Sequence, residues 1–164
     1  MSIKINYLNK VSNKSSGNLV LFVDEKLNIN VLKKNLSNSE FSYINDLLKT
    51  NDLKKNLFVF EVSSKKKIVL ISIKKDLKNF DIENLGSEFY VHINYGKNSE
   101  YLINSDSVTG KYENFIGHFL HGLKLKSYEF NKYKTKKEKR LISINVFGNK
   151  NKPSIPSQLK FKAL

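Results

Sequence analysis

Two histidines in the C-terminal half of the chain, His118 and His121, are the first candidates for a metal site. They are three positions apart in a segment with helical periodicity, so both side chains could lie close together, near Glu113 or a more distant carboxylate. A zinc site needs a third or fourth ligand in tetrahedral geometry, and none is apparent. We therefore expect these histidines to lie at the edge of the core, without a metal.

The segment from Asn104 to Lys111, NSDSVTGK, is a candidate phosphate site because it joins a predicted strand to the start of a predicted helix. A nucleotide pocket of this kind would favour more glycine and less bulk. Serine and aspartate are also the usual residues of helix caps. We therefore expect an ordinary capping loop here.

A basic run near the end of the chain is a candidate contact for a polyanion. It comprises Lys134, Lys136, Lys137, Lys139 and Arg140. The whole chain carries a formal net charge of +14, from 29 basic and 15 acidic residues, which favours nucleic acid as a partner. However, Arg140 is its only arginine, and proteins that read DNA rely on arginine for bidentate base contacts. We expect a solvated surface, with at most weak DNA binding.

Several other kinds of chemistry lack their residues in this sequence. Cysteine is absent, which excludes disulfides, thiolate metal sites and thiol nucleophiles. No His-Glu-x-x-His, glycine-rich phosphate loop or Gly-x-Ser-x-Gly elbow occurs. The N-terminus does not resemble a signal peptide, and no apolar run is long enough to span a membrane. We expect a cytoplasmic protein with no membrane partner.

The pattern of apolar residues predicts strands that alternate with helices. Strands are expected at 3–7, 18–24, 57–62, 68–73, 101–103 and 141–147. Between them we expect a short helix or turn at 28–36, a helix capped by Ser39, a helix capped by Asp81 and a helix from about Lys111. The short link between 57–62 and 68–73 favours an antiparallel pair. The sequence thus predicts an α/β fold of three layers, α/β/α, around a mixed central sheet.

The helix expected from Lys111 organises this arrangement. Phe115, Phe119 and Leu123 recur every fourth residue and should face the sheet. Gly122 interrupts the pattern at a cost of about 1 kcal/mol relative to alanine, so we expect another part of the molecule to approach closely there. Beyond it, we expect the segment with Tyr128, Phe130 and Tyr133 to lead back to the last strand. Phe130 should point inward and the two tyrosines toward solvent or polar partners.

This same segment resembles the end of the N-terminal domain of the leucyl aminopeptidases, the cytosol aminopeptidase family. The matching residues are Gly122, Leu125, Tyr128, Phe130, Tyr133 and Lys134. The resemblance implies a macro-domain-like fold for residues 1–148. Residues 149–164, which contain both prolines of the chain, then read as a linker toward an absent catalytic domain.

The resemblance also implies a function for a larger parent protein. In this family the catalytic domain carries a Gly-Lys-Gly segment and an Asn-Thr-Asp-Ala-Glu-Gly-Arg segment, and neither occurs here. We therefore assign no catalytic, cofactor-binding or metal-binding residue to this chain. The parent would be a cytosolic homohexamer that removes N-terminal residues from peptides with two zinc or manganese ions. This domain would contact its own catalytic domain and sister subunits, aiding assembly and substrate access. Two alternatives remain: a nucleic-acid-binding module, and a free-standing macro-like domain that binds a nucleotide.

Overall fold

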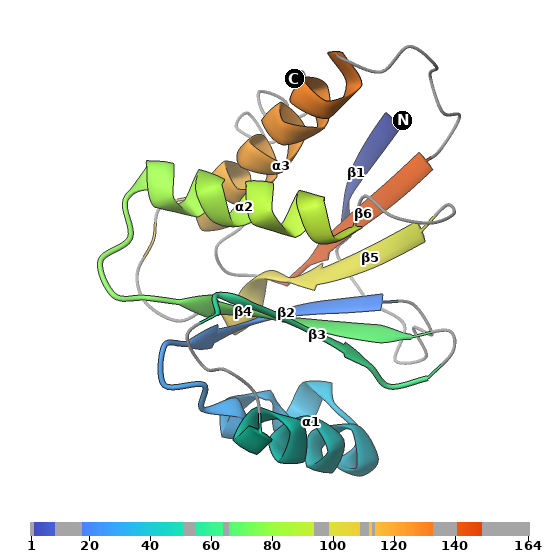
Figure 1. Cartoon of the computed structure of the whole chain (residues 1–164), viewed down its shortest axis with the longest axis vertical. Coiled ribbons are helices and arrows are strands. Elements are labelled where there is room, and N and C mark those ends of the chain that lie inside the picture. The colour runs from blue at the N-terminus through green and yellow to red at the C-terminus, as the bar shows by residue number, and fades with distance from the viewer. Residues whose placement is uncertain are drawn as a thin grey trace.

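Six strands and three α-helices make up the regular structure in the described part of the chain (Figure 1). The computed structural model describes residues 2–8, 18–50, 55–63, 66–93, 99–108, 112, 114–132 and 141–148. The strands are β1 (Ser2–Leu8), β2 (Asn18–Asp24), β3 (Leu57–Glu61), β4 (Lys67–Ile73), β5 (Ser99–Asn104) and β6 (Leu141–Phe147). The helices are α1 (Asn38–Thr50), α2 (Asn79–Ile93) and α3 (Phe115–Lys132), with short 3₁₀ helices at Ile29–Asn35 and Ser105–Ser107.

The strands form one mixed sheet in the order β1-β6-β5-β2-β4-β3. All neighbouring pairs are parallel except β3 and β4, which are antiparallel as the short link between them predicted. β2 lies in the middle, and its residues 19–23 are all buried. A strand covered on both faces needs such a continuous apolar run, because parallel strands are sandwiched between helices. β1 and β3 are the two edges.

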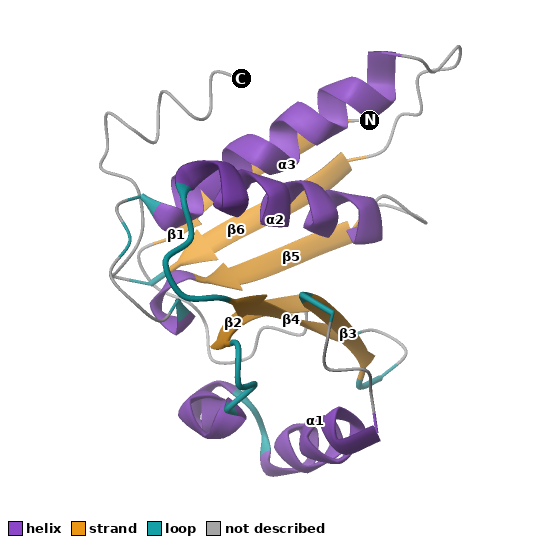
Figure 2. Ribbon diagram, turned by 60° about the vertical axis from the view of Figure 1, so that its left-hand side comes forward, coloured by secondary structure: helices purple, strands orange, loops and turns teal. Residues whose placement is uncertain are grey.

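Helices cover both faces of the sheet (Figures 1 and 2). α2 and α3 lie on one face, whereas α1 and the 3₁₀ helix Ile29–Asn35 lie on the other. Successive side chains of β2 point to opposite faces of the sheet. Val20 and Phe22 belong to the core under α2 and α3, while Leu21 and Val23 belong to the core over α1. The three-layer α/β/α fold with a mixed sheet is therefore confirmed.

Two helix starts differ in detail from the sequence-based prediction. Ser37, not Ser39, caps α1: its hydroxyl accepts a hydrogen bond from the Glu40 N–H at 3.2 Å, and the Glu40 carboxylate accepts one from the Ser37 N–H at 3.0 Å. This reciprocal pair is a capping box, in which the serine stands three residues before the glutamate. Asp81 lies inside the first turn of α2, where its carboxylate accepts a hydrogen bond from the Lys78 N–H at 2.9 Å.

The limits of α3 were also predicted incorrectly. The helix begins at Phe115 rather than near Lys111, and it continues to Lys132. Tyr128 and Phe130 are therefore helical, and they do not form a returning segment. The helix extends because Ser127, four residues after Leu123, continues its buried side. Tyr128 is 53% exposed, as expected for its position, while the side chain of Phe130 and all of Tyr133 lie outside the described residues.

Phe119 lies at the centre of the core between α3, α2 and β2. It is fully buried together with Phe115 and Leu123, so the prediction that these three residues face the sheet is confirmed. Its ring packs edge-on against Phe22 at 5.4 Å between ring centroids and lies 5.6 Å from the ring of Phe89. Figure 1 shows α3 lying across the sheet beside α2.

None of the described helices is both long and apolar enough to cross a membrane.

We expect the substitution Phe119→Ala to lower the free energy of unfolding by about 3–5 kcal/mol, as is typical when a buried phenylalanine is removed. Denaturant midpoints of the variant and the parent chain measure this loss. Phe80→Ala on α2 is the matched control, because Phe80 is 66% exposed and its removal should change stability little. Equal midpoints for Phe119→Ala and the parent chain would contradict the position assigned to α3.

Glu40 should make stability depend on pH. Burial raises its pKa, but the hydrogen bond from Ser37 and the contact with Lys66 Nζ, at 3.0 Å, outweigh burial and hold the pKa below the ordinary value of 4.5. A lowered folded-state pKa adds stability that is present above the unfolded-state pKa and is lost as the pH falls through the folded-state value.

Glu40→Gln should therefore lower the free energy of unfolding at neutral pH by up to about 1 kcal/mol, because glutamine can keep the capping hydrogen bond but loses the charge that interacts with Lys66 and the helix N-terminus. The difference from the parent chain should shrink as the pH falls through the lowered folded-state pKa, because the parent's carboxylate then becomes protonated as well. Denaturant midpoints at neutral pH and at a series of acidic pH values test this, with the exposed Glu25→Gln as control. A difference that stays constant with pH would show that the ionised carboxylate does not matter.

Candidate functional site

A close backbone contact between α2 and α3 involves one glycine from each helix. At Gly122, an added Cβ would overlap the backbone of Glu83 in α2. At Gly86, an added Cβ would overlap the carbonyl of Phe119 in α3. The close approach predicted at Gly122 is thus confirmed. Its counterpart Gly86 was not predicted, although a glycine inside a helical pattern was the available signal.

A hydrogen-bonding side chain lies beside this glycine contact. The hydroxyl of Ser87 is 3.1 Å from the carbonyl oxygen of Glu83 in its own helix and 3.1 Å from that of Gly122 in α3. Because Gly122 has no side chain, its carbonyl oxygen can come this near to the other helix. The residues that join α2 to α3 are thus structural.

The remaining motif residues lie in different environments. Gly122 is buried, but Leu125 is 46% exposed and Tyr128 is 53% exposed. Lys134, like Tyr133, lies outside the described residues. The motif does not form a common cavity in the part that the structure describes.

The two histidines on α3 have no metal-binding environment among the described residues, where no group of three potential metal ligands occurs. His121 Nε2 lies 3.6 Å from Glu83 Oε1, so this side chain faces α2 beside the glycine contact. His118 is partly buried. Both positions agree with histidines at the edge of the core. Glu113 lies outside the described residues.

The segment that could bind phosphate uses its hydroxyls inside the protein. The Ser105 hydroxyl donates a hydrogen bond to the carbonyl of Phe147 at 2.9 Å. The Ser107 hydroxyl donates one to the carbonyl of Asn104 at 2.6 Å and accepts one from the Phe22 N–H at 2.9 Å. These bonds join β2, β5 and β6 near their carboxyl ends. They support the interpretation of residues 104–108 as a structural turn; residues 109–111 are not described.

The basic run Lys134, Lys136, Lys137, Lys139 and Arg140 lies outside the described residues, as does the predicted linker 149–164.

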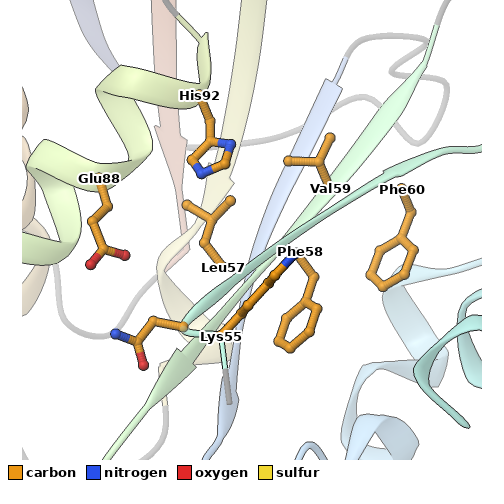
Figure 3. Close-up of a pocket in the computed structure, with 8 residues that line it drawn as sticks. Lys55, Leu57, Phe58, Val59, Phe60, Glu88 and His92 are labelled. Carbon is orange, nitrogen blue, oxygen red and sulfur yellow. The ribbon is translucent and has the colours of Figure 1, made fainter. Parts of the chain in front are cut away.

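A groove of about 580 Å³ runs along β3 and was not predicted from the sequence (Figure 3). Glu88 and His92 of α2 lie over the same side of β3 as Leu57 and Val59, whereas Phe58 and Phe60 point to the opposite side. Lys55, just before β3, also lines the groove. The available signal was the run 57–60, which is apolar at every position although β3 proves to be an edge strand.

Known proteins match this chain in structure but not in sequence. No protein-family model and no curated protein matches it. A mutant of tomato leucine aminopeptidase has a similar structure, with a TM-score of 0.65 and 15% identity, over 98% of this chain and 35% of the tomato chain. The cytosol aminopeptidase from Coxiella burnetii matches with a TM-score of 0.54 and 12% identity, over 95% of this chain and 30% of that one. This chain has the fold of one part of a leucine aminopeptidase.

The match is consistent with the N-terminal domain of a leucine aminopeptidase, as the motif around Gly122 predicted. The chain spans about a third of the length of the two aminopeptidases, and identities this low establish the fold alone. The macrodomain of Thermus aquaticus DarG also matches, with a TM-score of 0.49 and 9% identity, over 90% of this chain and all of that one.

The glycine contact gives a direct prediction. Gly122→Ala and Gly86→Ala should each lower the free energy of unfolding by about 1–3 kcal/mol, because the new methyl group forces the helices apart. The double variant should lose less than the sum, since one separation relieves both overlaps. Thermal or denaturant unfolding of all three variants measures this.

Asn84→Ala, on an exposed position of α2, is the matched control and should stabilise the domain slightly through helix propensity. If Gly122→Ala also stabilises, by about 1 kcal/mol, then nothing packs against that position.

Proposed function

We propose that this chain is the noncatalytic N-terminal domain of a leucyl aminopeptidase. The observation that carries the proposal is the match of 98% of this chain to 35% of tomato leucine aminopeptidase. A likeness that takes in nearly all of one chain and about a third of the other is what a single domain of a larger enzyme would give. The motif from Gly122 to Lys134 supports the same assignment, and Gly122 has a defined role in packing α3 against α2.

The chemistry of the proposed parent would come from a separate catalytic domain. That domain would hold two divalent metal ions, zinc or manganese, and remove N-terminal residues from peptides. Neither segment that supplies its lysines, carboxylates and arginine in this family occurs among the 164 residues. The domain described here would act in assembly and substrate access, against its own catalytic domain and sister subunits of a cytosolic homohexamer.

We expect this chain by itself to release no p-nitroaniline from leucine p-nitroanilide, even with excess manganese or zinc, because it lacks both catalytic segments. Tomato leucine aminopeptidase serves as the positive control in the same assay. Turnover that co-purifies with the folded chain and persists after contaminants are removed would contradict the noncatalytic assignment.

The reading frame that follows Leu164 tests the other half of the proposal. A leucyl aminopeptidase parent requires a Gly-Lys-Gly segment followed by an aspartate, and then an Asn-Thr-Asp-Ala-Glu-Gly-Arg segment. A frame that continues without either segment would contradict the proposal even if the chain proves inactive.

A further inference from the structure

The outer edge of β3 has no strand beside it in the described part of the chain. β3 pairs only with β4 and ends the sheet on that side. An open edge carries unpaired backbone N–H and C=O groups that can bond to another strand. The groove along β3 leaves space beside this edge (Figure 3).

The hydrogen bonds to β4 show which backbone groups face outward. The Asn56 carbonyl accepts a bond from the Ser72 N–H at 2.7 Å, and the Val62 N–H donates one to the Lys66 carbonyl at 3.1 Å. Bonded and non-bonded residues alternate along an antiparallel pair. The backbone N–H and C=O groups of the even-numbered residues of β3 therefore point toward β4. Those of Leu57, Val59 and Glu61 point to the outside of the sheet.

This edge lacks the features that usually prevent strand pairing. Residues 57–60 read LFVF, without the proline, lysine or bulge that commonly protects an edge. Val59 is 41% exposed. The opposite edge strand, β1, carries the exposed Lys4 next to its central residue. β3 is thus the better of the two edges for adding a strand.

We propose that β3 pairs antiparallel with β3 of a second copy of this chain, across a twofold axis at Phe58. In this register Leu57 lies opposite Val59 of the second copy. Lys55 lies opposite Glu61 of the second copy, and the symmetry repeats both pairs. The outward N–H and C=O groups of these residues then bond to each other, and the two sheets become one.

Charge complementarity selects both this occupant and this register. Only registers that place odd-numbered residues opposite each other let the outward groups bond. If the second strand is shifted by two residues in one direction, Glu61 lies opposite the apolar Leu57. If it is shifted by two residues in the other direction, Lys55 lies opposite Val59. The proposed register alone pairs apolar with apolar side chains and opposite charges with each other, as cross-strand stability requires. The side chain of Glu61 is 72% exposed and remains accessible beside its contact with Lys67, at 3.9 Å.

The net charge of +14 opposes association, so pairing should be weak at low ionic strength and stronger at physiological salt, where distant charges are screened.

The proposed pairing involves only residues 55–62 and their neighbours. It therefore does not depend on the proposed aminopeptidase function, and each can fail without the other.

Sedimentation equilibrium of the whole chain over a wide concentration range tests the pairing. The parent chain should dimerise, and Lys55→Glu or Glu61→Lys should each weaken dimerisation by about tenfold or more, because symmetry turns two attractive pairs into two repulsive ones. Mixing the two variants should restore association, since a Lys55→Glu chain beside a Glu61→Lys chain again pairs opposite charges. Lys4→Glu on β1, the same charge change at the other edge, should not disrupt dimerisation.

Amide hydrogen exchange reports the register directly. As concentration rises, protection should increase at Leu57, Val59 and Glu61, while Phe58 and Phe60 are already protected by β4. Val59→Pro should abolish dimerisation without loss of fold, because the N–H that it removes makes no bond in the monomer. Circular dichroism checks the fold, and Val59→Lys is a second variant that should also dissociate the dimer.

A parent chain that stays monomeric to millimolar concentration overturns the proposal, as does a dimer that Val59→Pro leaves intact. Alternating protection that appears only when an unrelated extended peptide is added would also overturn it, because the occupant would then not be a second copy.

Discussion

The close approach of α2 and α3, with Gly86 against the backbone of Phe119 and Gly122 against the backbone of Glu83, is the constraint on which one whole layer of this domain depends. Two helices can lie this close only where neither has a side chain, because a Cβ at either position would occupy the backbone of the other helix. The contact brings Phe119 near both Phe89 of α2 and Phe22 of β2. One backbone contact thus supports the aromatic centre of the core on this side of the sheet.

At the ends of the parallel strands, the packing depends on polar side chains rather than on the absence of a side chain. Buried serine hydroxyls there need partners, and Ser105 and Ser107 find them in the backbone of β2, β5 and β6. In many open α/β sheets this end of the strands holds the ligand. Here its described polar groups hold strands together. The strand-pairing surface that we propose lies instead at the edge of the sheet, around Val59.

Most elements were predictable from local pattern. The buried strand β2 follows from its continuous apolar run, the antiparallel pair β3–β4 from the short link between the two strands, and the inward residues of α3 from an apolar periodicity of about four. Helix ends were less predictable, because several residues near each start could act as the cap. Ser37 caps α1 in place of the predicted Ser39, because only Ser37 lies three residues before Glu40. The aromatic residues Tyr128 and Phe130 suggested a change of structure, but the buried side of α3 continues to Ser127 and the helix itself continues past both aromatic residues to Lys132.

By itself, the amino-acid sequence determined the three-layer fold class, the six strands, the organising helix and the need for a close neighbour at Gly122. The sequence determined these features because each of them depends on residues that are near one another along the chain. The tertiary structure alone decided that the neighbour is Glu83, that Gly86 makes the reciprocal contact, and that β3 forms an edge. Those outcomes depend on strand order and helix placement, which arise from contacts between distant segments and leave no local periodicity.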